Sequence, residues 1–405
     1  MWYNIINKRS QTAAYFNLKE NNVSLKNLGD VTYFRLNNEI NRPVNNQIPL
    51  HKDKEALDAF FKENVEPNYV KFNSFKERLD YLIEHDYIDT TMTDKYSVEF
   101  MEELHNWLYA QNFQFKSFMA AYKFYQQYAL KTNDNEYYLE NVEDRIWNNA
   151  LYFADGNEQL AKDLAEELVN QRYQPATPSY LSAGRSRRGE LISCFLIDIS
   201  QDSMNSIGRS INSALQLSRI GGGVGLNLSN LREAGAPIKG IQNAASGVVP
   251  VMKLLEDSFS YSNQLGQRQG AGAVYLSVHH PDIMSFLSTK KENADEKIRV
   301  KTLSLGLVVT DRFYEAARKN EPLYQFSPYD VEREYGKAFS YIDINAEYDN
   351  MVNNPRITKT SVNARVLEEE ISKLQQESGY PYIMNVDVVN RANPAGGRVI
   401  MSNLC

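Results

Sequence analysis

One stretch decides the predicted fold: ELISCFLIDISQDSMNSIGRSINSALQLSRIGGGVGLNL, residues 190–228. Only the ends of Glu190–Asp198 carry charge, which predicts a buried strand. A helix is predicted to follow, with Asp202 as its candidate N-cap and the glycine run 221–223 at its end. Val224–Leu228 is predicted to be a second strand. The residues expected on one apolar face of the helix are Met204, Ile207, Ile211, Ala214 and Leu215.

The same alternation continues downstream. A helix is predicted over Ser246–Tyr261, with Pro250 in its first turn, where a missing N–H is tolerated. Further strands are predicted over Ala273–Val278, Leu303–Thr310 and Tyr382–Val386 and beginning at Arg398–Met401, and further helices from about Asp311 and over Leu367–Glu377. Strands that alternate with helices imply a largely parallel sheet or barrel, so the predicted fold class is α/β.

The chain before this region has a helical pattern. From about Asp53 to Asn170 apolar residues recur three and four positions apart, and a helix is predicted over Gln159–Asn170. The polar N-terminal region is predicted to be weakly structured, with one strand at Thr32–Leu36. The predicted domains are an extension over 1–45, a helical domain over 46–172 and an α/β region over 173–405.

Composition narrows the class of protein. Hydrophobic residues make up 42% of the 405 residues and charged residues 23%, which is typical of a soluble globular protein. The net charge of −7 argues against a dedicated nucleic-acid or anionic-membrane binder, and it leaves a local basic pocket for a phosphate ligand open. No apolar stretch approaches a membrane span, and the N-terminus lacks an apolar signal core, so we expect a cytoplasmic location.

The sequence has few residues that could bind a metal. Its two cysteines, Cys194 and Cys405, are far apart, and its five histidines form no HExxH or similar spacing. We therefore predict that the chain holds no metal and that any metal belongs to a partner. Walker A and GxGxxG motifs are also absent from the sequence.

Four features could carry chemistry, and each also has an ordinary structural explanation. Cys194, inside a predicted strand, would on context alone be a core cysteine. Cys405 ends the segment MSNLC, which is harder to explain by packing. The run GGGVG (221–225) lets the backbone approach a ligand or forms only a tight turn. The loop QLGQRQGAG (264–272) is rich in hydrogen-bond donors suited to a nucleobase, or is only a solvated turn.

Taken together and in order, the motifs resemble one family, the large catalytic subunit of class I ribonucleotide reductase, and most of all its class Ib type. The resemblance extends from about residue 33 to the end, and residues 1–30 lie outside it. It implies a helical N-terminal domain followed by the first half of a ten-stranded α/β barrel. The motifs are KTNDNEYYLENVEDRIWNNALYFADG (131–156), QPATPSYLSAG (174–184), RRGELISCFL (187–196), LSRIGGGVGLNLSNLR (217–232), SNQLGQRQGAGAVYL (262–276), RVKTLSLG (299–306), FSPYD (326–330), ESGYPYIMNVD (377–387) and MSNLC (401–405).

The resemblance implies reduction of ribonucleoside diphosphates by thiyl-radical chemistry. Cys405 matches the cysteine that carries the thiyl radical, Asn403 matches its substrate-orienting neighbour, and Cys194 matches the first member of the reducing pair. The resemblance also implies five substrate contacts, which are Thr177, Ser193, Cys194, Gly223 and Asn403.

The resemblance also implies regulation and partners. Asp202 and Arg232 match residues that hold a deoxynucleoside triphosphate or ATP, with Mg²⁺, at a homodimer interface. Gln264, Arg268 and Gln269 lie in the loop that reports the effector to the substrate site. The radical would come from a small subunit with a manganese or iron dimetal centre, and the electrons from an external dithiol.

The family pattern continues beyond the given sequence. The family's catalytic carboxylate, second reducing cysteine, radical-relay tyrosines and C-terminal cysteine pair have no counterpart before residue 405. A truncation, the front half of a split subunit and a self-splicing element that begins at Cys405 all fit this pattern. A non-catalytic nucleotide-binding remnant is the alternative function. A glycyl-radical relative with a similar barrel fits the motifs less well.

Overall fold

The computed structural model describes residues 31–40, 42, 48–186, 189–220, 222–264 and 268–403. The chain divides into two compact units. The helical unit comprises Met1–Phe75 and His105–Arg145, and the sheet unit comprises Lys76–Leu104 and Ile146–Cys405. Helices α6 (Val98–Ala110) and α8 (Val142–Ala154) contribute residues to both units.

Aromatic side chains form the core of the helical unit. Tyr33 contacts the rings of Phe60 and Phe118, with centroid separations of 5.2 and 5.8 Å, and the last two rings are fully buried. The main elements are α2 (Thr32–Ile40), α3 (His51–Phe60) and α7 (Phe118–Lys123), with π-helical turns at Phe61–Val65 and Phe124–Tyr128 and a 3₁₀ turn at Glu66–Asn68.

The strand predicted at Thr32–Leu36 is wrong, because these residues belong to helix α2. A short run such as TYFRL fits a strand and a helix equally well. Packing against α3 buries Tyr33 and decides in favour of the helix.

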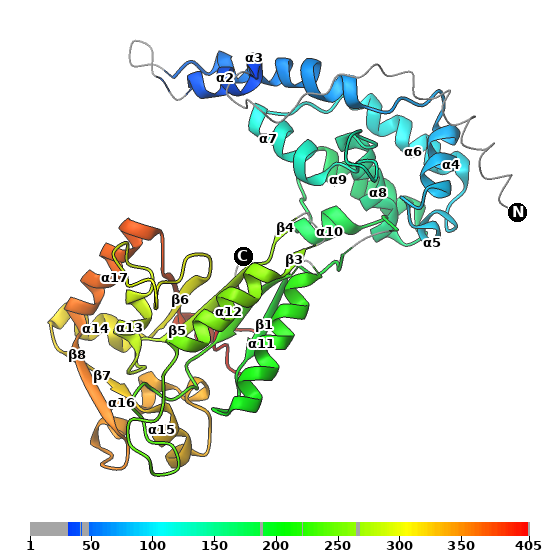
Figure 1. The fold of residues 1–405 in the computed structure, drawn as a ribbon. Helices are drawn as coiled ribbons and strands as arrows, with labels where there is room; N and C mark the ends of the chain where they lie inside the picture. Colours follow the sequence, from blue (N-terminus) through cyan, green and yellow to red (C-terminus); the bar gives the residue numbers. More distant parts are fainter. Residues whose placement is uncertain are drawn as a thin grey trace, which may run out of the picture. The chain divides into compact units, whose positions relative to one another are not determined.

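The sheet unit is built on five parallel strands in the order β1-β2-β5-β6-β9. Figure 1 labels β1, β5 and β6 of this sheet. Each strand returns to the sheet through at least one helix, as parallel pairing requires. The strands are β1 (Cys194–Asp198), β2 (Gly223–Asn227), β5 (Gly272–Ser277), β6 (Ser304–Val309) and β9 (Tyr382–Asn385). The parallel sheet predicted from the sequence is therefore confirmed, and five parallel strands agree with half of a ten-stranded barrel.

Many smaller elements complete the sheet unit. An antiparallel pair, β7 with β8, was not predicted, and a short hairpin joins β3 to β4. The strands of these pairs are β3 (Asn263–Gln264), β4 (Arg268–Gln269), β7 (Pro322–Phe326) and β8 (Lys359–Asn363). The helices are α4 (Phe75–Glu84), α5 (Thr90–Thr93), α9 (Glu158–Val169), α10 (Thr177–Ser182), α11 (Met204–Arg219), α12 (Val249–Tyr261), α13 (Ile283–Ser288), α14 (Asp311–Lys319), α15 (Pro328–Tyr335), α16 (Ile344–Asn353), α17 (Ala364–Ser378) and α18 (Val386–Ala392), with a 3₁₀ turn at Phe339–Tyr341.

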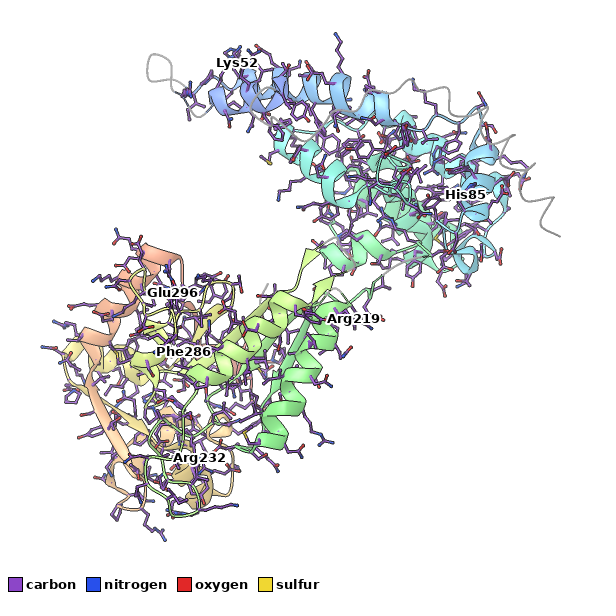
Figure 2. All side chains as sticks on the ribbon, in the orientation of Figure 1. Lys52, His85, Arg219, Arg232, Phe286 and Glu296 are labelled. Atoms are coloured by element: carbon purple, nitrogen blue, oxygen red, sulfur yellow. The ribbon has the colours of Figure 1, made fainter. Side chains whose placement is uncertain are left out.

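The two faces of the sheet are covered differently. Alternate residues of β2, β5 and β6 join a large core with the helices, in which Phe286 of α13 is fully buried (labelled in Figure 2). The intervening residues face the other way and pack in a smaller apolar cluster, which we call the inner cluster. The inner cluster contains Ala273, Tyr275, Val308, Met384, Val386, Ile400 and Met401.

Two predictions around the first strand are wrong. The strand begins only at Cys194 and is half-exposed, because β1 lies at the edge of the sheet with one strand neighbour. Ser203, not Asp202, caps α11, since its side chain accepts a hydrogen bond from the Ser206 amide. Met204, which the sequence assigns to the apolar face of this helix, is 83% exposed.

The last strand predicted from the sequence is also absent. Residues 398–403 form an irregular segment, which we call the terminal segment, and no strand is assigned within it. Its apolar residues Ile400 and Met401 are nevertheless buried, because the segment packs on the inner cluster.

Two neighbouring histidines are buried and neutral. His279 Nδ1 donates to the Tyr324 carbonyl at 3.0 Å, and its Nε2 accepts from the Thr310 hydroxyl at 2.8 Å. Burial lowers the pKa of His279 from 6.5 to about 4. His280 Nε2 donates to the Leu231 carbonyl at 2.7 Å, and burial lowers its pKa as well. Both rings are therefore held by hydrogen bonds in the interior.

A depressed histidine pKa links stability to pH. An unfolded histidine takes up a proton near pH 6.5, whereas His279 in the folded chain does so only near pH 4. Stability is therefore full above pH 6.5 and is lost as the pH falls toward 4, by about 3 kcal/mol for this residue. Urea unfolding at pH 7 and pH 4.5 should show this loss, and His279→Gln should reduce the difference. His51→Gln, at an exposed position, is the control; an equal pH dependence in all three proteins would contradict the prediction.

Candidate functional site

The terminal segment lies across the inner face of the sheet. The Tyr275 hydroxyl on β5 donates to the Asn403 carbonyl at 2.9 Å. A Cβ atom at Gly225 on β2 would lie 2.5 Å from the Ser402 carbonyl oxygen and 3.0 Å from Asn403 Cα. The backbone that carries Asn403 is thus in direct contact with β2 and β5.

Three residues singled out from the sequence share this inner face. Leu196 contacts the position of a Gly225 Cβ at 3.3 Å, so these two residues face the terminal segment. Cys194 and Gly223 lie two positions earlier on their strands and are paired in the sheet register. Because side chains alternate along a strand, Cys194 faces the same way as Leu196. The structure therefore brings Cys194, Gly223 and Asn403 to one face.

The other two predicted substrate contacts are Ser193, directly before β1, and Thr177 in α10. The Ser193 carbonyl accepts a hydrogen bond from the Gly223 amide at 2.7 Å. Thr177 begins α10, and Ser179 in the same helix donates its hydroxyl to the Leu191 carbonyl at 2.6 Å. This bond ties the first turn of α10 to the residues that lead into β1.

Asp202 and Arg232 form an ion pair beyond the carboxyl ends of β1 and β2. Both side chains are about 85% buried, and Arg232 also donates to the Pro237 carbonyl at 2.7 Å. Its guanidinium lies 4.6 Å from the centre of the Tyr329 ring (Arg232 is labelled in Figure 2). The two residues matched to effector binding are therefore joined to each other, and the arginine is held by three groups.

The loop that carries Arg232 is organised by residues that the sequence reasoning missed. The Asp282 carboxylate accepts from the Ala234 amide at 3.0 Å and from the Val248 amide at 3.1 Å. Gly247 has a positive φ of 74°, and a Cβ there would lie 2.4 Å from an Asp282 oxygen. The sequence held one signal for this arrangement, a glycine close to the start of a predicted helix, but it does not identify the distant carboxylate.

A buried polar group also lies between the ends of β1 and β2. Asp198 accepts from the side-chain amides of Asn227 at 3.3 Å and Asn230 at 3.1 Å, and burial raises the pKa of Asp198. The Asn230 oxygen in turn accepts from the Ser340 amide at 2.9 Å. This network fixes the turn that leads into the Arg232 loop.

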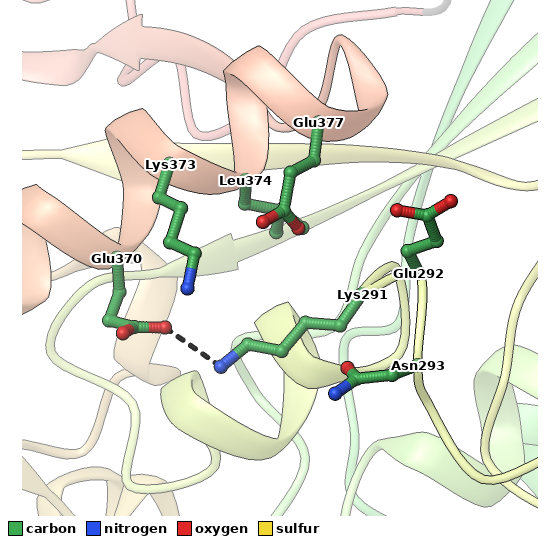
Figure 3. A pocket seen from close by; sticks show the side chains of 7 residues that line it. All are labelled: Lys291, Glu292, Asn293, Glu370, Lys373, Leu374 and Glu377. Carbon is green, nitrogen blue, oxygen red and sulfur yellow. Dashed lines mark hydrogen bonds and ion pairs between the residues drawn. The ribbon is translucent and has the colours of Figure 1, made fainter.

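A separate surface groove of about 400 Å³ lies between α17 and the segment after α13 (Figure 3). The ion pair of Lys291 with Glu370, at 2.7 Å, spans it and lowers the pKa of Glu370. Its lining carries charges of both signs rather than a few converging polar groups in an apolar pocket, so it does not resemble a ligand site. Its lining residues are Lys291, Glu292, Asn293, Glu370, Lys373, Leu374 and Glu377.

Comparison with known proteins decides the family. Residues 192–405 match the model of the ribonucleotide reductase barrel domain, residues 114–188 that of the ribonucleotide reductase all-alpha domain, and residues 33–113 that of the ribonucleotide reductase N-terminal region. The chain belongs to the ribonucleotide reductase large-subunit family. It is close to the class Ib type, as the motifs indicated.

Several relatives are named ribonucleoside-diphosphate reductase subunit alpha. That of Mycoplasma genitalium is 55% identical over 353 residues, covering 87% of this chain and 49% of the relative. That of Bacillus subtilis is 49% identical over 375 residues, covering 92% of this chain and 53% of the relative. The NrdEB subunit alpha of B. subtilis is 50% identical over the same length, which is 34% of that relative. The chain thus spans about half the length of the first two relatives.

Cys405, the residue matched to the thiyl radical, lies outside the described part of the chain. For Gln264, Arg268 and Gln269 only the backbone is described, and it pairs as an antiparallel hairpin, Gln264 opposite Arg268. Within the described ranges no group of three or more His, Cys, Asp or Glu residues could hold a metal ion. In the same ranges no helix is long and apolar enough to span a membrane.

Proposed function

We propose that this chain is the N-terminal part of a ribonucleoside-diphosphate reductase large subunit, which reduces ribonucleoside diphosphates for DNA precursor synthesis. One observation carries the proposal: the terminal segment holds Asn403 against the sheet face that Cys194 and Gly223 share. In the printed sequence Cys405 follows two residues after Asn403. A thiol that follows this contact is well placed along the chain to meet a substrate on the same face.

The proposed chemistry needs both cysteines and groups that lie beyond this sequence. A thiyl radical on Cys405 removes the 3′ hydrogen atom of the ribose, and a carboxylate from the remainder of the subunit takes the 3′-hydroxyl proton. The 2′ oxygen then leaves as water. Cys194 and a second cysteine supply two electrons and two protons and become a disulfide, after which Cys405 returns the hydrogen atom. A small subunit with a manganese or iron dimetal centre supplies the radical.

The amino ends of β1 and β2 suit the substrate in this proposal. Gly223 leaves room for close approach, and its amide is already bonded to Ser193. Thr177 contributes a hydroxyl from the first turn of α10. An external dithiol would reduce the disulfide after each turnover.

The proposed regulation uses the other end of the same strands. Asp202 and Arg232 would bind a deoxynucleoside triphosphate or ATP with Mg²⁺, and the hairpin that contains Gln264, Arg268 and Gln269 would report the bound base. Effector binding then has to replace the present ion pair between Asp202 and Arg232 with contacts to the ligand. A loop with two arrangements is the element that such coupling requires.

A homodimer is proposed through α11 and α12, which pack against each other (Figure 1). Met204 on α11 is 83% exposed, and Leu254 and Tyr261 on α12 are 54% and 84% exposed. Large apolar side chains exposed on two adjacent helices favour a protein partner over solvent.

The first test of this function is activity. The chain alone should not reduce nucleoside diphosphates, because the general base and one reducing cysteine are missing, and loss of one such group lowers rates by orders of magnitude. Adding a fragment with the missing residues and the small subunit should restore turnover, measured as deoxynucleotide formation. Turnover with the small subunit but without the fragment would contradict the proposal. Deoxynucleotide binding without restored turnover would favour the non-catalytic remnant.

The second test separates the two cysteines in the reconstituted enzyme. Cys405→Ser should abolish exchange of the 3′ hydrogen, because an O–H bond is much stronger than an S–H bond. Cys194→Ser should keep hydrogen abstraction and substrate breakdown but prevent repeated turnover. If both folded variants lost 3′-hydrogen exchange equally, the two roles would be wrongly assigned.

The third test concerns the effector site and can use the chain alone. We expect dTTP to bind and to promote dimerisation. Arg232→Ala should weaken binding by about 1.5–3 kcal/mol, the loss of charge-assisted hydrogen bonds to phosphate, as calorimetry would measure. Arg268→Ala and Gln269→Ala should instead change the preferred substrate base in the reconstituted enzyme. A folded chain that binds no deoxynucleotide, or whose affinity is unchanged by Arg232→Ala, would remove this site.

A further inference from the structure

The base of the terminal segment is anchored by α18. The Asn390 side chain accepts from the Val399 amide at 2.8 Å and donates to the Val399 carbonyl at 2.9 Å, as a neighbouring strand would. Arg398 is 18% exposed and lies 3.5 Å from the Asp343 carboxylate and 3.8 Å from that of Asp387. These contacts determine where the segment leaves α18.

The middle of the segment is held by apolar burial. Ile400 and Met401 are 8% and 6% exposed and complete the inner cluster with residues of β5, β6 and β9. Such packing holds the segment against the sheet, but it is non-directional and does not by itself fix the position of Asn403.

Beyond this apolar part, directional contacts hold residues 402 and 403. Gly225 permits contact between two backbones, since a Cβ there would meet the Ser402 oxygen at 2.5 Å, well inside ordinary contact distance. Tyr275 supplies the matching hydrogen bond to the Asn403 carbonyl. The ring of Tyr275 reaches this position by lying over Gly306, where a Cβ would meet the ring at 2.3 Å.

The chemistry of Tyr275 suits a fixed donor. Its side chain is 3% exposed, and burial raises its phenol pKa, so the hydroxyl keeps its proton throughout the neutral range. A serine or threonine at the same position on β5 could not span the width of an aromatic ring to reach the segment. A phenylalanine would fill the same space without the bond.

We propose that Tyr275 and Gly225 are positioning residues of the reductase site, which hold the backbone at Ser402 and Asn403 so that Cys405 meets the substrate in one geometry. This inference rests on the proposed function for its catalytic consequence. The hold on the segment itself is a property of the chain and can be measured separately. Neither residue has to touch the substrate for this role.

The first experiment measures hydrogen–deuterium exchange of residues 398–403 in the 405-residue chain. Tyr275→Phe should speed exchange in this segment by about 3- to 10-fold, the range expected for one hydrogen bond, and leave β2 and β6 unchanged. Gly225→Ala should have a larger effect, because it displaces the segment.

Tyr348→Phe is the matched control: it removes a buried hydroxyl that accepts from the Tyr324 amide at 2.8 Å in the other core. Gly208→Ala, where a Cβ meets nothing within 4 Å, is the second control.

The second experiment measures kinetics in the reconstituted enzyme. Tyr275→Phe should lower kcat by about 3- to 10-fold with KM changed less than about twofold, because the reacting group and not the substrate is misplaced. Gly225→Ala should lower kcat by about 100-fold, as a displacement near 1 Å does in other enzymes. A variant that only destabilised the fold would lose active protein, and titrating active sites would correct for that loss.

The outcomes are distinct. Unchanged exchange at 398–403 in both variants would overturn the positioning role. Faster exchange with unchanged kcat would overturn its catalytic consequence. If the unsubstituted reconstituted enzyme has no activity, the proposed function fails, while the exchange measurement still decides whether Tyr275 and Gly225 hold the segment. Should Gly225→Ala not fold, Tyr275→Phe, which removes one oxygen atom, carries the test.

Discussion

The structure depends on the burial of β2, β5 and β6 on both faces. Every residue of these three strands is buried, so each face of the sheet needs an apolar cover. Helices supply it on one face, and on the other the inner cluster includes Ile400 and Met401 from the terminal segment. Burial of Ile400 and Met401 on the second face therefore holds the segment that carries Asn403 against the sheet.

Glycines in the strands make this second cover fit closely. Gly225 and Gly306 have no side chain to pack, and glycine in the interior of a strand weakens it. In return, Gly225 admits a backbone and Gly306 admits the ring of Tyr275. The resulting contacts are polar and directional, so the inner face has a defined geometry where apolar packing alone would leave freedom.

Loops at the strand ends are held by buried carboxylates. The Glu256 carboxylate on α12 accepts hydrogen bonds from the amides of Lys301 at 2.5 Å and Thr302 at 2.8 Å. Desolvation alone would raise the pKa of Glu256, but these two bonds and the contact with Lys253 outweigh it, so the pKa is lowered. Asp282 does the same for the loop that carries Arg232. Each acceptor satisfies backbone donors that would otherwise be buried without partners. Arg232, one of the proposed effector residues, therefore lies next to a fixed end of its loop.

The sequence by itself determined the helical pattern from residue 53 and the order of the parallel strands with helices between them, because apolar period, glycine and proline act locally. It could not place Thr32–Leu36 in a helix or β1 at the edge of the sheet, since these depend on distant neighbours. Nor could it exclude Asp202 as the cap of α11, because the carboxylate of Asp202 pairs with Arg232, 30 positions away. Motifs brought Cys194 and Asn403 forward as candidates. Only the tertiary structure placed them on one face and disclosed Tyr275, because that hydrogen bond joins residues 128 positions apart.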